Sequence, residues 1–333
     1  MSFNQYTWDL YKQTTIGIEM IKYFSDAGGY VSFKDYCPYA NFIPEDLYND
    51  WLENIYCYGV SDYDHPSSLE EAKDLYISLI TLGIRVEGQQ WLPANDFKNM
   101  LGIIQPMSYV LSQFAPEYFF PYLFLCRIFE LNKIADFFNI DLPNIPKRTD
   151  YKGRCMYYWE LCEVFYLFRK ENGLSPADLW SFLYDFAPNN LPSEKIDMPK
   201  PSQVWFIGGR LYQEDKSLES KFWQSSPETK KGDILVHYET SPISAITCIE
   251  ISLTDGVIDP LFRYYGCIYI GNRINIPHIT LKELQTDEYF FKHPLVRKNF
   301  QGVNGWSVNS ENYSELLRMI KTKGFDIEVL PKL

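Results

Sequence analysis

The chain has 333 residues, a formal net charge of −12 and an aromatic content of 17%. Its hydrophobic content of 46% and charged content of 22% exclude intrinsic disorder for most of the chain, and its length suits one large domain or, better, two ordinary domains with separate cores. A pI of about 4.9 argues against a protein that holds nucleic acid by bulk charge alone.

The first residues, MSFNQYTWDLYKQ, contain no basic region followed by an apolar run, so we expect no signal peptide. The most apolar stretch, 109–129, contains Glu117, Arg127 and two prolines, which favours buried helices over a membrane span. The 7 cysteines lack a C-x-x-C pair, and the 4 histidines form no matching ligand set. We therefore expect reduced cysteines, no metal, no cofactor, no membrane and a cytoplasmic location.

Residues 1–198 have the pattern of a mainly α-helical, acidic domain of unknown function. Ser68-Leu-Glu-Glu71 has the form of a capping box before a helix that reaches about Leu82. Residues 155–170 predict a further helix, and Ser175-Pro176 opens the next one with proline at its first position. One buried helix face is predicted from the spacing of Leu131, Ile134, Ala135 and Phe138.

The turn at Asn172-Gly173 between two predicted helices also suggests a helix-turn-helix reader of DNA. The acidic charge favours simple helix packing instead, because phosphate contacts need Lys and Arg.

Residues 186–203 contain four prolines and little periodicity, which predicts a linker. From residue 200 onward, 11 Lys and 5 Arg balance 6 Asp and 10 Glu, a net charge of 16 − 16 = 0. The whole excess of −12 therefore lies in the first 199 residues, with 31 − 16 = 15 basic and 43 − 16 = 27 acidic residues. The second part is compatible with a polyanion.

Residues 200–333 change to a strand pattern. Short strands are predicted at 204–207, at 234–238 after a Gly-Asp turn, and at 262–271. A closing helix ends before Gly324. These elements predict a small mixed β-barrel, so the fold class is α+β. A further strand is predicted from alternation that places Ile243, Ala245, Thr247, Ile249 and Ile251 on one face.

The order of four segments resembles the PUA-like superfamily, in particular its EVE branch and the related YTH and ASCH domains. The segments are VWFIGGRLY (204–212), Phe222-Trp223, KKGDILVHYETSPISAITCIEI (230–251) and HPLVRKNFQGVNGWSV (293–308). The resemblance covers about residues 200–325 and implies a curved barrel that binds RNA or DNA and reads a modified, for example methylated, base. It also implies a bacterial defence or restriction role beside a nuclease or helicase. Fold analogy alone does not establish function.

The resemblance places Trp223 and Tyr238 as walls of a base pocket, where aromatic stacking contributes roughly 1–3 kcal/mol per base. Gly209, beside Gly208, would let a ligand approach the backbone closely. In a chain with this many aromatics, a given Trp or Tyr is more often a core residue than part of a base pocket. The other candidate base or backbone contacts are Arg210, Tyr212, Arg297, Asn299 and Gln301.

No enzyme motif stands out. The chain lacks a P-loop, a G-x-S-x-G elbow and a nuclease-type His or acidic cluster, so we expect no catalytic residues. Asp233 is interpreted as a turn residue rather than a catalytic acid. The alternative function is a protein-interaction module, in which the barrel is structural and the aromatic-rich helical domain binds a partner protein.

Overall fold

The computed structural model describes residues 3–25, 59–86, 89–124, 127–192, 198–210 and 221–333. The chain divides into two compact units: Met1–Ser193 with Asp259–Arg263, and Glu194–Ile258 with Tyr264–Leu333. The first boundary lies inside the segment predicted as a linker. The assignment of 259–263 to the helical unit was not predicted, because nothing in a five-residue loop reveals its partner.

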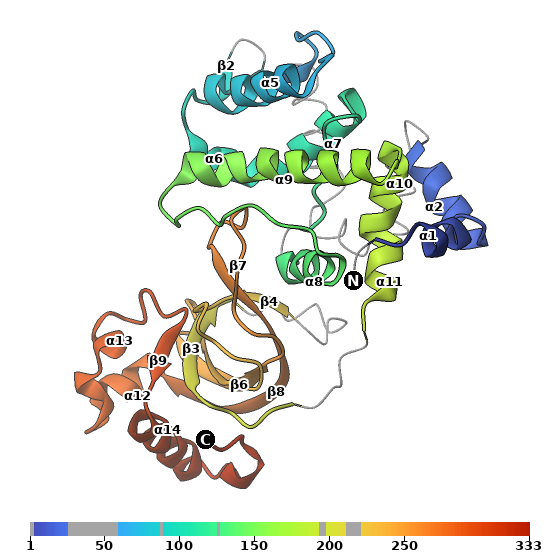
Figure 1. Ribbon diagram of the computed structural model, residues 1–333. Helices are drawn as coiled ribbons and strands as arrows, with labels where there is room; N and C mark the ends of the chain where they lie inside the picture. Colours follow the sequence, from blue (N-terminus) through green and yellow to red (C-terminus); the bar gives the residue numbers. More distant parts are fainter. Residues whose placement is uncertain (1–2, 26–58, 87–88, 125–126, 193–197, 211–220) are drawn as a thin grey trace. The chain divides into compact units, whose positions relative to one another are not determined.

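The helical unit contains one long helix, α9 (Tyr151–Glu171), and several shorter elements (Figure 1). No described helix is long and apolar enough to span a membrane. The other described elements are α1 (Gln5–Tyr11), α2 (Thr15–Ser25), α5 (Leu69–Leu82), β1 (Ile84–Val86), β2 (Gln89–Leu92), α6 (Phe97–Met100), η3 (Leu101–Ile103), α7 (Ile104–Phe114), α8 (Ile128–Phe138), α10 (Pro176–Ser181), η4 (Phe182–Phe186) and α11 (Ala187–Asn190).

Helix starts follow the capping signals in the sequence. Ser175 and Asp178 form a complete capping box with Pro176 at the first helical position, as predicted. Ser68 caps α5, but Glu71 bonds the backbone N–H of Ser67 rather than that of Ser68. The predicted buried face of α8 is confirmed, since its four apolar residues are all buried.

The long helix α9 carries a fully buried cation. Arg154 is 1% exposed and donates to the carbonyl oxygens of Arg148, Pro260 and Phe262 at 2.6–3.0 Å. Because a buried guanidinium needs its donors satisfied, these carbonyls fix segment 259–263 in the helical unit.

The second unit is built on a mixed sheet that curls into a half-barrel (Figure 1). Within the described residues the strand order is β4-β8-β6-β5-β3-β9, and β7 pairs with β8. Strands β3 and β5 are parallel, and the other pairs are antiparallel. The strands are β3 (Val204–Gly209), β4 (Lys221–Gln224), β5 (Ile234–Glu239), β6 (Ala245–Ser252), β7 (Val257–Ile258), β8 (Gly266–Thr280) and β9 (Trp306–Val308).

The predicted alternation along β6 is wrong. Ile246 and Ile249 belong to the same core cluster, although they are three residues apart. The register with β5 shifts there, since His237 pairs with Cys248 whereas Tyr238 pairs with Ile246. Thr247 is thus an extra residue, a β-bulge that exchanges the two faces of the strand. Strand β8 likewise runs to Thr280, well beyond the predicted end at 271.

The sheet has two apolar faces. The outer face packs against α12 (Leu281–Thr286), α13 (Pro294–Arg297) and α14 (Ser310–Thr322), with the short turns η5 (Phe290–Lys292) and η6 (Ile327–Val329) beside them. Each large apolar side chain buried there contributes about 1.5–3 kcal/mol. The inner face gathers Trp205, Ile207, Leu235, Ile268 and Ile270, and Trp223 packs on them.

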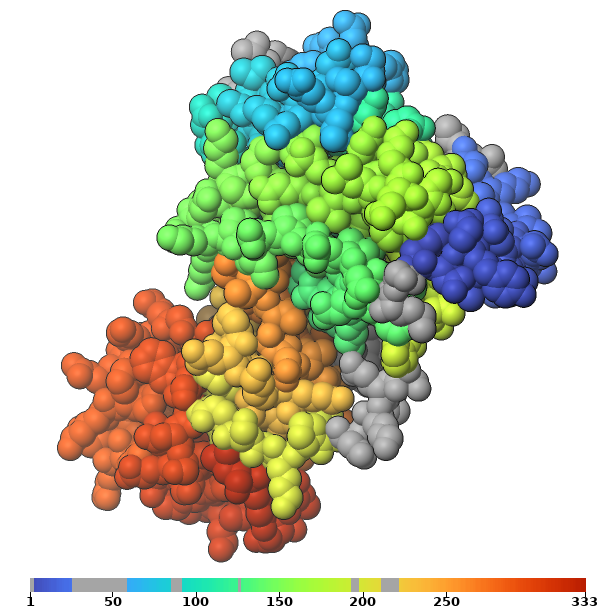
Figure 2. Space-filling model, viewed as in Figure 1, coloured from blue at the N-terminus to red at the C-terminus, as the bar shows by residue number. Residues whose placement is uncertain are grey.

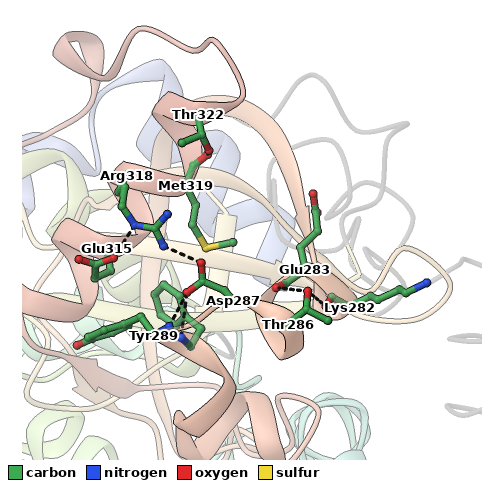
Figure 3. Close-up of polar contacts among 10 residues, drawn as sticks. Lys282, Glu283, Thr286, Asp287, Tyr289, Glu315, Arg318, Met319 and Thr322 are labelled. Atoms are coloured by element: carbon green, nitrogen blue, oxygen red, sulfur yellow. Dashed lines mark hydrogen bonds and ion pairs between the residues drawn. The ribbon is translucent and has the colours of Figure 1, made fainter.

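Polar contacts join α12 to α14 over the outer face (Figure 3). The carboxylate of Asp287 accepts from the backbone N–H groups of Tyr289 and Phe290 and from Arg318, at 2.6–3.1 Å. Arg318 also donates to Glu315 at 2.6 Å. The C-terminal helix is therefore tied to the end of α12 by charge as well as by apolar packing.

Asp233 is confirmed as a turn residue. Its carboxylate is 1% exposed and accepts from the backbone of Ser202, Gln203 and Lys230 and from the indole of Trp205, at 2.8–3.1 Å. This one side chain ties the segment before β3 to the turn before β5.

Replacing Asp233 by alanine leaves several buried donors unsatisfied. We expect Asp233→Ala to lower the free energy of unfolding by about 3 kcal/mol or more, measured by urea denaturation of the full chain. Exposed Glu228, on the same loop, provides the control: Glu228→Ala should change it by less than about 0.5 kcal/mol. Equal effects of the two substitutions would contradict this role.

Candidate functional site

A buried polar cluster lies among the apolar residues of the half-barrel's inner face. His237 on β5 and Glu250 on β6 are 0% and 1% exposed. His237 Nδ1 lies 2.9 Å from Glu250 Oε2, and Arg273 of β8 donates its Nε to Oε1 at 2.7 Å. The bulge at Thr247 places Glu250 on this face, next to the strand that carries His237.

The surroundings of this cluster shift the pKa values of Glu250 and Cys248 in opposite directions. Burial alone would raise the pKa of Glu250, but its hydrogen bonds to His237 and Arg273 and the charge of Arg273 lower it below its ordinary value. Burial raises the pKa of the neighbouring Cys248 thiol to about 12, so this thiol stays protonated. The carboxylate is therefore the one anion among these side chains.

His237, Cys248 and Glu250 place three ligand-type atoms within 4.8 Å of one another, which raises the question of a metal. Both oxygens of Glu250 already accept charged or polar donors, and Arg273 adds a positive charge beside them. The chemistry of this set fits a buried ion pair better than a cation site.

Trp223 lies at this cluster. It sits on β4, paired with Ile268 of β8, and its ring meets the His237 ring edge-on at a centroid distance of 4.8 Å. A Cβ at Gly209 would come within 2.5 Å of Trp223 Cζ2. The close approach predicted at Gly209 was that of a ligand, and in this structure the Trp223 ring lies against the Gly209 backbone.

Asn304 holds Trp223 in place. Its Oδ1 accepts from the Gly208 N–H at 2.7 Å and from Trp223 Nε1 at 3.3 Å, and its Nδ2 donates to Gln224 at 3.2 Å. Asn304 lies in the segment 293–308 but was not among the predicted site residues. A signal was available, since an Asn directly before a glycine, here Gly305, is typical of a turn in which the Asn side chain bonds the backbone.

Tyr238 lies on the other face of the sheet. It is 3% exposed and stacks on Phe300 at a centroid distance of 4.0 Å and an interplanar angle of 3°. Trp223 and Tyr238 thus do not wall one pocket, contrary to the expectation. Because successive strand residues face opposite ways, His237, next to Tyr238, is the residue that shares a face with Trp223.

The remaining candidates make contacts elsewhere in the unit. Arg210 is exposed and donates to the Ser241 carbonyl at 3.3 Å. Arg297, Asn299 and Gln301 are exposed around the end of α13, where Asn299 accepts from Gln285. Tyr212 lies outside the described residues.

The turn after α13 has a backbone function. Asn299 and Phe300 both have positive φ, 51° and 60°, a region that non-glycine residues rarely adopt. This conformation places Phe300 against Tyr238 on the outer face and brings Asn304 to Trp223 on the inner face. The turn at 299–304 therefore contributes side chains to both faces of the sheet.

Comparisons with known proteins add little to this geometry. No family model matches the chain, and no curated protein matches it. An NMR structure of Rpa0253 from Rhodopseudomonas palustris is 14% identical, with a TM-score of 0.31, and the match covers 36% of this chain and 94% of that one. A likeness this weak assigns neither a fold family nor a function.

Removing the Asn304 amide should loosen the site. Asn304→Ala leaves the Gly208 N–H without its acceptor, so we expect a loss of about 1–3 kcal/mol in the free energy of unfolding. Asn304→Asp keeps the acceptor oxygen and should cost less, which chemical denaturation of both variants will measure. An Asp variant as destabilised as the Ala variant would contradict the acceptor role.

The interactions of Glu250 with His237 and Arg273 should make the free energy of unfolding depend on pH. Because the folded-state pKa of Glu250 is lowered, its contribution is present above the ordinary value of 4.5 and is lost as the pH falls through the lowered value. Glu250→Ala should cost about 3–5 kcal/mol near neutral pH, and less in acid. Denaturation at several pH values checks this, with exposed Glu288→Ala as the control. A cost that does not fall in acid would contradict it.

Proposed function

We propose that the second unit binds a single modified base of DNA or RNA in a PUA/EVE-like manner, with the base ring against Trp223 and its edge toward His237. One observation carries the proposal: Nε2 of the fully buried His237 has no hydrogen-bond partner among the described residues, directly beside an aromatic ring. A buried polar atom left unpaired costs about 1–3 kcal/mol, which a ligand can recover.

The energetics are consistent with base reading. Swinging a base out of a stack costs roughly a few kcal/mol. Stacking on an aromatic ring recovers roughly 1–3 kcal/mol of this, and a methyl group adds apolar area that the ring and its apolar neighbours desolvate. The apolar residues of the inner face, Trp205, Leu235 and Ile268, supply that surface.

The charge of the unit favours recognition by a pocket. Residues 200–333 carry 16 basic and 16 acidic residues, so phosphate attraction is weak and the base itself must supply the affinity. On this proposal a partner nuclease or helicase acts on the nucleic acid in a bacterial defence or restriction setting, because the sequence holds no motif for either activity.

Binding of the full chain to oligonucleotides tests the proposal. The probes are identical single strands that carry one methylated, hydroxymethylated or unmodified base. We expect tighter binding to at least one modified strand, and a loss of about tenfold or more with Trp223→Ala, since stacking is removed. Phe291→Ala, which removes a ring that is 45% exposed in the same unit, serves as the matched control and should bind normally.

Two outcomes would contradict the proposal: equal binding of modified and unmodified strands, or an unchanged preference in a folded Trp223→Ala variant. Either outcome would favour the alternative, in which the barrel is structural and the aromatic-rich helical unit binds a partner protein.

A further inference from the structure

We infer that His237 selects the base by accepting a hydrogen bond, so that the site takes bases with an exocyclic amino N–H, such as adenine or cytosine derivatives, over those with a keto oxygen there. The inference rests on the proposed function and deepens it. It names a specificity-determining atom, Nε2 of His237, and the residue that sets its hydrogen-bonding role, Glu250.

The first step concerns which ring nitrogen carries the proton. Glu250 Oε2 lies 2.9 Å from Nδ1, and an ionised carboxylate can only accept. The pKa of Glu250 is lowered, which keeps it ionised. We therefore assign the proton to Nδ1, and the lone pair remains on Nε2.

The second step concerns the charge of the ring. Arg273 already neutralises Glu250 through its 2.7 Å hydrogen bond, and the Cys248 thiol next to the pair is neutral. A second positive charge on His237, at 0% exposure, would lie in the same cluster as the Arg273 guanidinium, which shares Glu250 and is also affected by the charge of Glu239. Because a buried charge near a like charge is costly, we assign a neutral ring, whose Nε2 is an acceptor.

The third step concerns access to Nε2. The Trp223 ring contacts the His237 ring edge-on, and its hydrogen bond to Asn304 is long, at 3.3 Å. Trp223 is only partly buried, which leaves this ring room to move aside. A base that reaches Nε2 must displace this ring, and binding should therefore change the indole fluorescence.

An acceptor at this position discriminates by chemistry. An amino N–H completes the hydrogen bond that Nε2 lacks, whereas a keto oxygen would face the lone pair with a lone pair of its own. Sites built to satisfy a buried polar group reject an analogue that cannot pair with it.

The experiment compares matched bases in the full chain. Single strands differ only at one base, 5-methylcytosine against thymine and adenine against hypoxanthine. Each pair exchanges an amino group for a keto group, and the adjacent ring nitrogen changes from an acceptor to an N–H donor. For whichever of the two pairs the wild-type protein binds, it should bind the strand with the amino base at least about tenfold more tightly than the strand with the keto base. The His237→Gln side chain offers both a donor and an acceptor, so the ratio of the affinities for the amino and keto strands should be near one.

Glu250→Gln should change the base preference of the protein, which a purely structural role of Glu250 would leave unchanged. Its amide can donate to Nδ1, which transfers the ring proton to Nε2 and turns the acceptor into a donor. A folded Glu250→Gln variant should therefore prefer the keto member. If this variant fails to fold, as circular dichroism would show, His237→Gln alone decides.

The outcomes separate the two claims. Equal or tighter binding of the keto base, or an unchanged preference in His237→Gln, overturns the inference, whereas the proposed function stands if Trp223→Ala still loses binding. No binding of the wild-type chain to any of these or the modified strands overturns both.

Discussion

A single carboxylate inside the half-barrel constrains the rest of the second unit. Glu250 is 1% exposed and ionised, and removing such a group from water costs several kcal/mol unless each oxygen is paired. Arg273 and His237 provide that pairing from the two neighbouring strands. The register of three adjacent strands, including the bulge at Thr247, therefore has to bring these residues together.

The two faces of the sheet are linked through one turn. Phe300, held at positive φ, stacks on Tyr238 on the outer face, and Val303 packs close to Gly208. One residue further on, Asn304 bonds Gly208 and Trp223 on the inner face. The packing of the outer face and the position of Trp223 therefore both depend on the turn at 300–304.

Local signals in the sequence predicted the elements well, and predicted side-chain partners poorly. Capping at Ser175, the turn function of Asp233 and the helical face of α8 depend on neighbours a few residues away. The pairing of Trp223 with Tyr238 failed because the two positions, although both in matching motifs, lie on opposite faces. Glu250 and Arg273 were missed because a bulge, which period-two alternation does not reveal, brings them to His237. The hydrogen bond from Arg154 to Pro260, in segment 259–263, is likewise a long-range contact that local sequence patterns do not reveal.

The inferred base selectivity depends on Glu250 fixing the His237 ring with its proton on Nδ1. Nitrogen-15 NMR of the histidine-labelled full chain without ligand measures this directly, with exposed His278 as an internal reference. The account predicts a protonated Nδ1 and an unprotonated Nε2 for His237 near neutral pH. A protonated Nε2, alone or together with Nδ1, would contradict it.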